Sequence, residues 1–336
     1  MKTSLLSAFV LAVCAGCAAL VADDSAGGSS QLGSVRAKAK DVLGALPDKM
    51  PGGENDSAQL VALGRKLYFD KLLSVNQTIS CNSCHVVDNN KGGVDGEATS
   101  PGAFGKRGGR NSPTVLNAGF HFAQFWDGRA PHLQAQAKGP ILNPIEMAMP
   151  NEAEVLNRLR ASPDYTALFD QAFPNAGDKI TYDNLAHAIA AFERTLVTHD
   201  RFDDFLKGDD KALNSRELRG LDLFLNTGCT TCHQGPLLGA TTYQKVGLIH
   251  PYENKEDLGR EAVTKDEDDR YKFKVPTLRN IAITGPYFHD GTRKTLKEVV
   301  PQMAHMQLDK QLTTDEVDSV VAFLNTLTDK PRRTRK

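Results

Sequence analysis

The sequence predicts a mainly α-helical protein built from two domains, and three observations carry this expectation. Apolar residues recur at helical spacing in several segments, and no segment has the alternating pattern of a half-buried strand. The chain of 336 residues is long enough for two domains of ordinary size. A short motif of two cysteines and one histidine occurs twice, beginning at residue 81 and at residue 229.

The overall charge is balanced. The chain has 40 Lys and Arg against 41 Asp and Glu, and 40% of its residues are hydrophobic. This balance produces no global field that would draw the chain onto nucleic acid or an anionic membrane surface. We therefore expect no nucleic-acid partner. We also expect no membrane span, because no stretch approaches the ~18 apolar residues that cross a bilayer.

The N-terminus has the pattern of a secretory signal peptide. Lys2 precedes an apolar run over residues 5–21, and acidic residues follow directly. We expect residues 1–22 to be removed and the mature protein to be exported to the periplasm. A second outcome stays open, because Cys17 could become the lipid-bearing first residue of a bacterial lipoprotein.

The remaining chain divides into three parts. Residues 23–40 contain the run Gly27-Gly28-Ser29-Ser30, which predicts a flexible leader. The N-terminal domain is expected over residues 41–200 and the C-terminal domain over residues 201–336. The last helix of the second domain could pack back on the first.

Helix boundary signals mark four segments, namely residues 152–160, 182–197, 215–226 and a last helix that follows Thr313. Asn151 with Glu154, and Thr313 with Glu316, have the spacing of capping boxes. Gly228 stands where a helix-ending glycine belongs. Between the helices, residues 86–150 and 234–292 are long Gly/Pro-rich loops, which are plausible in a compact domain only when they wrap something.

Four of the six cysteines lie in the repeated motif. It reads Cys81-Asn82-Ser83-Cys84-His85 and Cys229-Thr230-Thr231-Cys232-His233. This is the attachment signature of haem c, in which two thiols bind the porphyrin and the adjacent histidine ligates the iron. A thioredoxin-like pair would not need the histidine, and a zinc site would need a second ligand pair nearby. The prediction is a mainly α protein with two cytochrome c-like haem domains and long haem-wrapping loops.

The second axial ligand of each iron decides whether a haem transfers electrons or does chemistry. For the second haem, Met303 and Met306 are the candidates. For the first haem the downstream candidates are Met147, Met149, His121 and His132. Gln136 and Glu146 lie in the same loop, and a carboxyl beside an open haem could move protons. From the residues alone, the single tryptophan, Trp126, is either a core aromatic or an electron relay.

Several longer runs, in matching order from about residue 40 to about residue 325, resemble the bacterial di-haem cytochrome c peroxidases. These runs are Arg110-Asn111-Ser112-Pro113-Thr114-Val115-Leu116-Asn117, Phe125-Trp126-Asp127-Gly128-Arg129, Gln136-Ala137 with Gly139-Pro140, Asn143-Pro144 with Glu146-Met147, Val275-Pro276-Thr277-Leu278-Arg279-Asn280, and Pro286-Tyr287-Phe288-His289-Asp290-Gly291.

The resemblance implies different roles for the two haems. The N-terminal haem would be the low-potential haem that binds hydrogen peroxide, and the C-terminal haem would admit electrons, with Met303 as its distal ligand. Glu146 matches the acid/base that moves a proton between the peroxide oxygens. Gln136 matches the amide that positions peroxide, and Trp126 matches the ring that conducts electrons between the haems.

The resemblance also implies a calcium ion and protein partners. Asn111, with the backbone carbonyls of Thr284 and Pro286, matches an inter-domain calcium site, and oxygen donors suit that ion. The family's pattern implies a homodimer and a small periplasmic electron donor, either a cytochrome c or a cupredoxin.

One position departs from the pattern. Many family members have a histidine in the loop after the first motif, which closes the resting peroxidatic haem until the other haem is reduced. The alignment puts Ala103 there, which predicts a haem that is open without reductive activation. A different alignment of the loop, or closure by a remote histidine such as His121, stays open.

The function expected from these observations is peroxide reduction by a cytochrome c peroxidase. Two rival functions remain. One is a non-catalytic di-haem electron carrier, which the haem motifs alone would permit. The other is a di-haem oxidase of a protein partner, as in methylamine dehydrogenase maturation. That branch has tyrosine as the distal ligand of the second haem, so Met303 counts against it.

Overall fold

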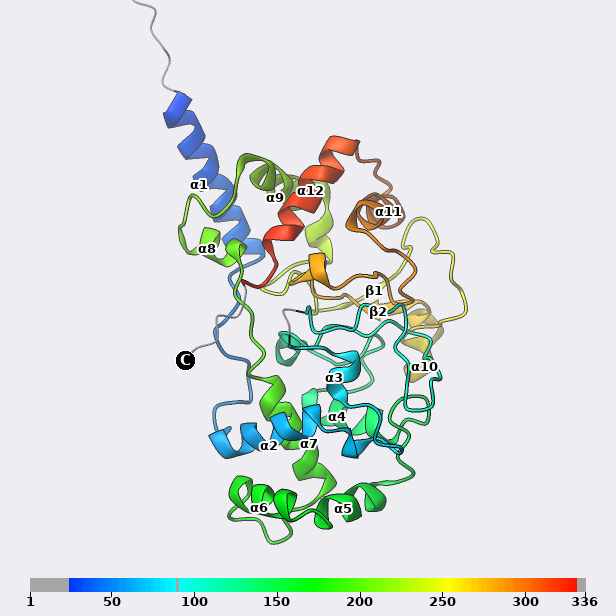
Figure 1. The fold of residues 1–336 in the computed structure, drawn as a ribbon. Coiled ribbons are helices and arrows are strands. Elements are labelled where there is room, and N and C mark those ends of the chain that lie inside the picture. Colours follow the sequence, from blue (N-terminus) through cyan, green and yellow to red (C-terminus); the bar gives the residue numbers. More distant parts are fainter. Residues whose placement is uncertain (1–23, 89–90, 331–336) are drawn as a thin grey trace, which may run out of the picture.

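Two pairs of crossing helices organise the molecule (Figure 1). In the lower half of the view, α2 (Ala58–Phe69) crosses α7 (Tyr182–Glu193). In the upper half, α9 (Ser215–Thr227) crosses α12 (Thr314–Thr326). We call the part built on α2 and α7 the N-terminal lobe and the part built on α9 and α12 the C-terminal lobe.

A glycine allows each pair of helices to approach closely. A Cβ atom added to Gly64 of α2 would lie 1.7 Å from the carbonyl oxygen of Ala188 in α7. A Cβ atom on Gly220 of α9 would lie 1.9 Å from the carbonyl oxygen of Ser319 in α12. No side chain fits at either distance, so each lobe needs a glycine at the point where its two helices cross.

The computed structural model describes residues 24–88 and 91–330, so the predicted signal peptide and Cys17 lie outside the described residues. Its regular structure is mainly helical, which confirms the predicted class. The remaining α-helices are α1 (Asp24–Val42), α3 (Cys81–Cys84), α4 (Leu133–Leu142), α5 (Glu152–Arg160), α6 (Pro163–Ala172), α8 (Arg201–Lys207), α10 (Glu261–Thr264) and α11 (Leu296–Leu308). The 3₁₀ turns are η1 (Lys71–Leu73), η2 (Ala118–Phe120), η3 (Cys229–Thr231), η4 (Glu267–Asp269) and η5 (Ile281–Ile283).

Most helix boundary signals were interpreted correctly. Helix α5 has the predicted bounds, and a capping box with Thr313 and Glu316 opens α12. Helix α7 ends at Glu193, earlier than residue 197, and the chain then turns toward the C-terminal lobe. Helix α4 was missed, because Gly139 and Pro140 lie inside it and favoured a loop.

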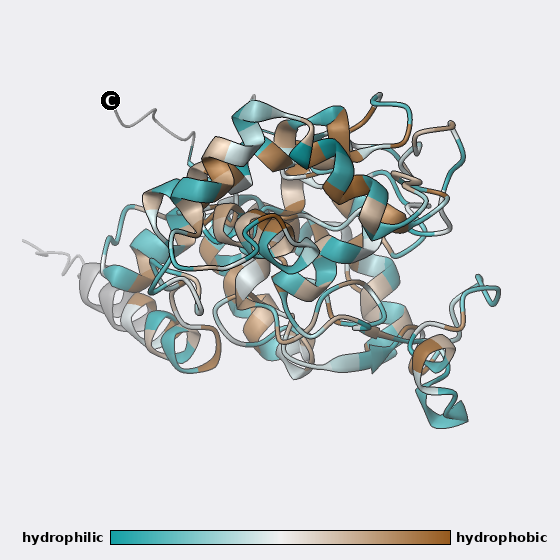
Figure 2. Ribbon diagram, turned by 90° about the horizontal axis from the view of Figure 1, so that it is seen from below, coloured by the Kyte–Doolittle hydropathy of each residue, from teal (hydrophilic) through white to brown (hydrophobic). Residues whose placement is uncertain are grey.

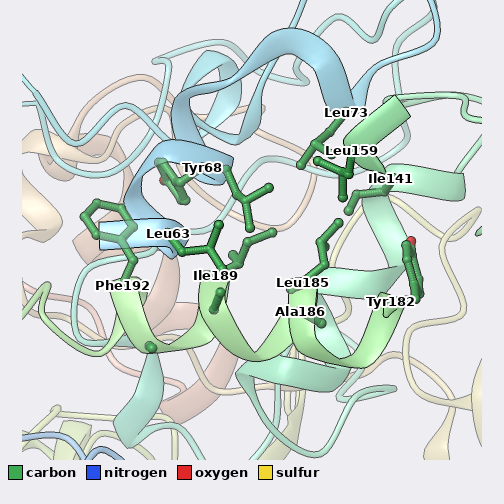
Figure 3. Packing of buried hydrophobic residues seen from close by; sticks show 14 of the residues in the cluster. Leu63, Tyr68, Leu73, Ile141, Leu159, Tyr182, Leu185, Ala186, Ile189 and Phe192 are labelled. Carbon is green, nitrogen blue, oxygen red and sulfur yellow. The ribbon is translucent and has the colours of Figure 1, made fainter. Parts of the chain in front are cut away.

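Each lobe has its own hydrophobic core. In the N-terminal lobe, Leu63 and Tyr68 of α2 pack with Leu185, Ile189 and Phe192 of α7 (Figure 3). Figure 2 shows hydrophilic and hydrophobic residues alternating along the helices, as expected when one face of each helix is buried.

The prediction of a flexible leader over residues 23–40 was wrong. Helix α1 covers residues 24–40, and Leu32, Val35 and Ala39 pack into the core of the C-terminal lobe against α8 and α9. The Gly/Ser run suggested a linker, but the apolar residues that follow it recur at helical spacing and bury one face. Helix α1 therefore lies on the C-terminal lobe, and the chain then enters the N-terminal lobe (Figure 1).

The last helix does not pack back on the N-terminal lobe. Helix α12 packs on α9 and α11, and Val320, Phe323 and Leu324 enter the core of the C-terminal lobe. The proposed return was wrong because α12 is one half of the helix crossing that forms this lobe. Among the described residues, no helix has both the length and the apolar character needed to cross a membrane.

A short β-ribbon lies between the lobes (Figure 1). Strand β1 (Tyr243–Lys245) pairs antiparallel with β2 (Lys272–Lys274), and Tyr243 faces Lys274 in the register. Three residues per strand are too few to give an alternating pattern in the sequence, which is why the ribbon was missed. It brings Phe273 and Lys274 to the boundary between the two halves of the molecule.

Candidate active site

The first Cys-x-x-Cys-His motif forms one helical turn in the wall of a cavity in the N-terminal lobe. Helix α3 contains Cys81 and Cys84, and its first residue follows Ser80, whose side chain takes part in a capping box with Ser83. Both cysteines are free, and both line the cavity together with His85. We call this space the N-terminal cavity.

The second motif has the corresponding position in the C-terminal lobe. Gly228 ends α9 with φ 111°, a left-handed conformation that glycine adopts without strain, and this turns the chain into η3. Cys229, Cys232 and His233 line a second, largely apolar cavity between α9, α11 and the β-ribbon. We call it the C-terminal cavity.

The two motif histidines are held in the same way. Nδ1 of His85 lies 3.0 Å from the carbonyl oxygen of Pro113, and Nδ1 of His233 lies 2.9 Å from that of Leu238. A carbonyl only accepts hydrogen bonds, so Nδ1 carries the proton and Nε2 is the nitrogen that can ligate iron. Burial lowers the pKa of both histidines, which favours the neutral imidazole that a metal needs.

Gln136 and Glu146 lie on the wall of the N-terminal cavity with the first motif. Gln136 comes from α4, and Glu146 from the loop that follows this helix. The side-chain amide of Asn143 donates a 2.7 Å hydrogen bond to Oε1 of Glu146. Burial raises the pKa of Glu146, although this hydrogen bond and the charge of Arg129 oppose the shift.

The other predicted ligands of the first haem are distributed over different environments. Met147 lines the N-terminal cavity, whereas Met149 is buried in the core of the N-terminal lobe. His132 caps α4 by accepting a hydrogen bond from the amide of Ala135. His121 lines the C-terminal cavity instead. Among the described residues that line the N-terminal cavity, His85 is the one histidine.

Ala103 is tied to the loop that carries the acid. Its amide donates a 2.7 Å hydrogen bond to the carbonyl oxygen of Glu146, and its carbonyl accepts one of 2.5 Å from the side chain of Asn76. The neighbouring Phe104 is 63% exposed. This segment therefore contacts the acid-bearing loop through its backbone and has no side chain that could ligate iron.

The two methionines of α11 have different surroundings. Met303 lines the C-terminal cavity that contains His233. Met306 is buried in a small cluster with Tyr252 and Phe288, and its sulfur lies 3.7 Å from the side-chain nitrogen of Gln302. Of the two, Met303 alone lines the described cavity that contains His233.

Trp126 lies between the cavities and lines both of them. Its indole Nε1 donates a 2.9 Å hydrogen bond to the carbonyl oxygen of Asn111, which fixes the ring. Its own carbonyl accepts a 2.7 Å hydrogen bond from the amide of Lys274 in β2. The hydrogen bond to Asn111 therefore orients the ring, and the contact with the ribbon holds the Trp126 backbone.

The three residues of the expected calcium site line the same cavity. Asn111, Thr284 and Pro286 all border the C-terminal cavity. The side-chain nitrogen of Asn111 donates to the carbonyls of Glu97 and Ala98, so its Oδ1 remains as a possible ligand. Within the described part of the chain, no backbone hydrogen bond ends at the carbonyl of Thr284 or Pro286. Oxygen donors of this kind fit Ca²⁺.

Comparison with known proteins identifies the family. A family model for "Di-haem cytochrome c peroxidase" matches residues 58–211, and one for "Cytochrome c" matches residues 218–328. The cytochrome c551 peroxidase of Nitrosomonas europaea is 48% identical over 276 residues, which cover 81% of each chain. The chain belongs to the di-haem cytochrome c peroxidase family. The Pseudomonas aeruginosa cytochrome c551 peroxidase is 47% identical, with 84% of this chain and 82% of that one covered.

The fold has a matching relative among solved structures. A MauG-like protein associated with microbial copper homeostasis is 32% identical and has a TM-score of 0.73, with 85% of this chain and 93% of that chain covered. Members of the family carry two covalently bound haem c groups. The residues present fit them, because each cavity has two free thiols beside a neutral histidine whose Nδ1 is already bonded.

Arg129 and Glu193, which were not predicted as site residues, are among the charged residues of the N-terminal cavity. Arg129 lines the cavity, and its guanidinium lies 3.5 Å from the ring centre of Phe125. Glu193 at the end of α7 is 6% exposed, and burial raises its pKa to about 8. In the sequence, Glu193 has no partner at a diagnostic spacing, so only the packing of α7 reveals it.

Proposed function

We propose that this protein is a periplasmic peroxidase that reduces hydrogen peroxide to water with electrons from a small redox protein. One hydrogen peroxide, two electrons and two protons give two waters. The observation that carries the proposal is the presence of Gln136 and Glu146 in the cavity that also contains Cys81, Cys84 and His85. A di-haem protein that only transferred electrons would have no use for an acid and an amide beside one haem.

Glu146 is the acid/base of the proposed reaction. When bound, the N-terminal haem supplies the iron centre at which the O–O bond is cleaved. Asn143 occupies Oε1 of Glu146 through its hydrogen bond, which leaves Oε2 to carry the proton. Oε2 takes a proton from one peroxide oxygen and returns it to the other as the bond breaks. Gln136 orients the peroxide with its amide.

Cys229, Cys232, His233 and Met303 would hold the C-terminal haem, which would supply the point of electron entry. Trp126 would lie on the route from there to the N-terminal haem. Supporting this route, the Trp126 ring borders both cavities and is fixed by its 2.9 Å hydrogen bond to Asn111. The donor is a small periplasmic cytochrome c or cupredoxin.

With Ala103 at the family's histidine position, no side chain there would close the N-terminal haem, so the enzyme would need no reductive activation. Supporting this proposal, the family's histidine position is occupied by Ala103, and His121, the remote alternative, lines the other cavity and bonds with Lys274. Electron paramagnetic resonance of the fully oxidised enzyme, repeated after half-reduction, tests it. We expect no low-spin bis-histidine signal in either state. Such a signal from this haem in the oxidised enzyme would contradict the proposal.

Asn111, Thr284 and Pro286 would hold the calcium ion through oxygen atoms, and the active enzyme would be a calcium-dependent homodimer. Equilibrium dialysis of the holoenzyme should retain calcium, and Asn111→Ala should lose it. Light scattering before and after treatment with a calcium chelator should report a dimer that dissociates. Retention of calcium by Asn111→Ala would remove this site, and a wild-type monomer in calcium would remove the dimer.

Peroxide turnover with a reduced donor tests the activity. The Glu146→Gln enzyme should keep both haem spectra and lose turnover by ~10²-fold or more, the size expected for loss of a general acid/base. Glu152→Gln, on an exposed residue that begins α5, is the matched control and should keep wild-type turnover. Absence of turnover in the wild-type enzyme would favour the electron-carrier function, and full turnover in Glu146→Gln would remove its role.

The protein-partner oxidase is the second rival, and the MauG-like structural relative makes it relevant. Met303 in the C-terminal cavity favours the peroxidase, because the rival branch uses tyrosine as the distal ligand at that position. Spectroscopy of the oxidised C-terminal haem separates the two, since methionine and tyrosinate ligation give different absorption bands.

A further inference from the structure

A buried lysine and a buried histidine form a pair at the boundary between the lobes. Nζ of Lys274, from β2, lies 2.9 Å from Nδ1 of His121, which follows η2. Lys274 is 5% exposed and His121 is 9% exposed. Both residues line the C-terminal cavity. Neither has a part in the proposed reaction.

The pair has no acidic partner. Among the described residues that line the C-terminal cavity, Lys274 is the one Lys, Arg, Asp or Glu. Burial lowers the pKa of Lys274 to about 7, and Lys274 is the one charged neighbour that perturbs the pKa of His121. A buried amine is usually paired with a carboxylate, because the unpaired charge loses its hydration without compensation.

The second ring nitrogen of His121 also lacks a partner. When Lys274 is protonated, its ammonium has only donors, so Nδ1 of His121 must accept and Nε2 must carry the proton. Among the described residues, Nε2 of His121 is buried and has no hydrogen-bond partner. Buried donors are almost always satisfied, so this N–H requires an acceptor.

A haem c in this cavity would supply the two groups that the pair lacks, namely a negative charge beside Lys274 and an acceptor for Nε2 of His121. Each haem has two propionate groups, and a carboxylate both accepts hydrogen bonds and neutralises a buried cation. We propose that Lys274 and His121 form the binding site for a propionate of the C-terminal haem and raise that haem's reduction potential. The proposal rests on haem c at Cys229, Cys232 and His233, and it deepens the proposed role of this haem as the point of electron entry.

The position of the pair suits this role. The amide of Lys274 donates to the carbonyl of Trp126, so the charged side chain is anchored beside the proposed electron path. A positive charge near a haem stabilises the reduced state, which has one more electron than the oxidised state. The low dielectric of a buried site makes this effect stronger than at the surface. The N-terminal cavity instead has Arg110 and Arg129 in its wall, together with the acids Glu146 and Glu193.

Spectroelectrochemical titration of the holoenzyme measures the predicted effect. Lys274→Met should lower the equilibrium constant for reduction of the C-terminal haem at least tenfold, equal to 59 mV for a one-electron couple. Lys274→Arg, which keeps a cation, should stay closer to the wild type than Lys274→Met. Lys272→Met is the control, since Lys272 lies in the same strand but pairs with Asp269, and it should change the constant less than twofold.

A crystal structure of the wild-type holoenzyme provides a test that needs no variant. We expect a propionate oxygen within hydrogen-bond distance of Nζ of Lys274 or Nε2 of His121. The proposal is overturned if both propionates of the C-terminal haem bind elsewhere. It is also overturned if Lys274→Met carries both haems and its equilibrium constant for reduction of the C-terminal haem stays within twofold of the wild-type value. Loss of peroxide activity in the wild-type enzyme would affect the proposed function alone, because neither measurement depends on turnover.

Discussion

Asn143 donates a 2.7 Å hydrogen bond from its side-chain amide to Oε1 of Glu146, a residue in the wall of the N-terminal cavity. Burial raises the pKa of the Glu146 carboxyl, and the hydrogen bond partly offsets this rise because it favours the ionised form. The hydrogen bond therefore orients the Glu146 carboxyl, and its pKa is set by the opposing effects of burial and this bond. Two predictions about pH follow from this contact.

The first prediction concerns the acid limb of the pH profile. Glu146 must be ionised to take a proton from peroxide, so turnover should fall as the pH drops through its pKa. Since burial raises that pKa above the usual value of 4.5, the inflection should lie above 4.5. The profile of kcat/KM measures it. The limb should be missing from the residual activity of Glu146→Gln, and a limb unchanged in that variant would belong to another group.

The second prediction concerns Asn143→Leu. The substitution removes the donor that stabilises the ionised carboxyl, so the pKa of Glu146 should rise further. The acid limb should move to higher pH, with the activity loss greatest under acidic conditions and smallest above the shifted inflection. A limb that moved to lower pH would show that Asn143 does not stabilise the carboxylate.

The third prediction separates the methionines of α11. Met303→Ala should remove the methionine absorption band of the oxidised C-terminal haem, because this residue lines the cavity with His233. Met306→Leu should keep the band, because this residue belongs to the cluster of Tyr252 and Phe288. Visible spectroscopy of both variants decides the matter. Loss of the band in Met306→Leu alone would reverse the assignment.

The fourth prediction concerns the buried ion pair that joins the inter-lobe segment to the loop before η5. Arg279 and Asp200 are both 0% exposed in their side chains, with Nη1 and Oδ2 2.6 Å apart. Replacing Arg279 by Met removes the cation that pairs with the buried carboxylates of Asp200 and Asp203, which should lower the free energy of unfolding by about 3–5 kcal/mol. Urea titration measures this change. Arg216→Met, at an exposed pair with Asp315, should change it by less than about 1 kcal/mol.

The fifth prediction concerns the helix crossing in the N-terminal lobe. Gly64→Ala should destabilise the protein by about 1–3 kcal/mol, because the new methyl group would overlap the carbonyl of Ala188 and force the helices apart. Gly33→Ala in α1, where no atom lies within 4 Å of the added carbon, should be neutral or slightly stabilising. Thermal unfolding compares the two. Equal stability of Gly64→Ala and the wild type would mean that the helices move apart freely.

Features that depend on contacts within one helical turn were predictable from the sequence, whereas features that depend on packing between distant segments were not. Capping residues such as Thr313 and Glu316 were found because they contact one another within one helical turn. Helix α1 was misread because its stability comes from packing on α8 and α9, which its Gly/Ser start does not reveal. Helix α4, which carries Gln136, was missed because tertiary packing overrides the poor helix propensity of Gly139 and Pro140.

The sequence by itself determined the fold class and predicted the haem attachment motifs, because both depend on spacing within a few residues of the chain. Only the tertiary structure decided which side chains surround each haem. Lys274 and His121 are 153 residues apart, and Trp126 is bonded both to Asn111 and to the β-ribbon. Contacts of this kind form when distant segments pack and exclude water. Burial then leaves the amine of Lys274 without an acidic residue beside it in the C-terminal cavity and raises the pKa of Glu146. No local sequence pattern could reveal either effect.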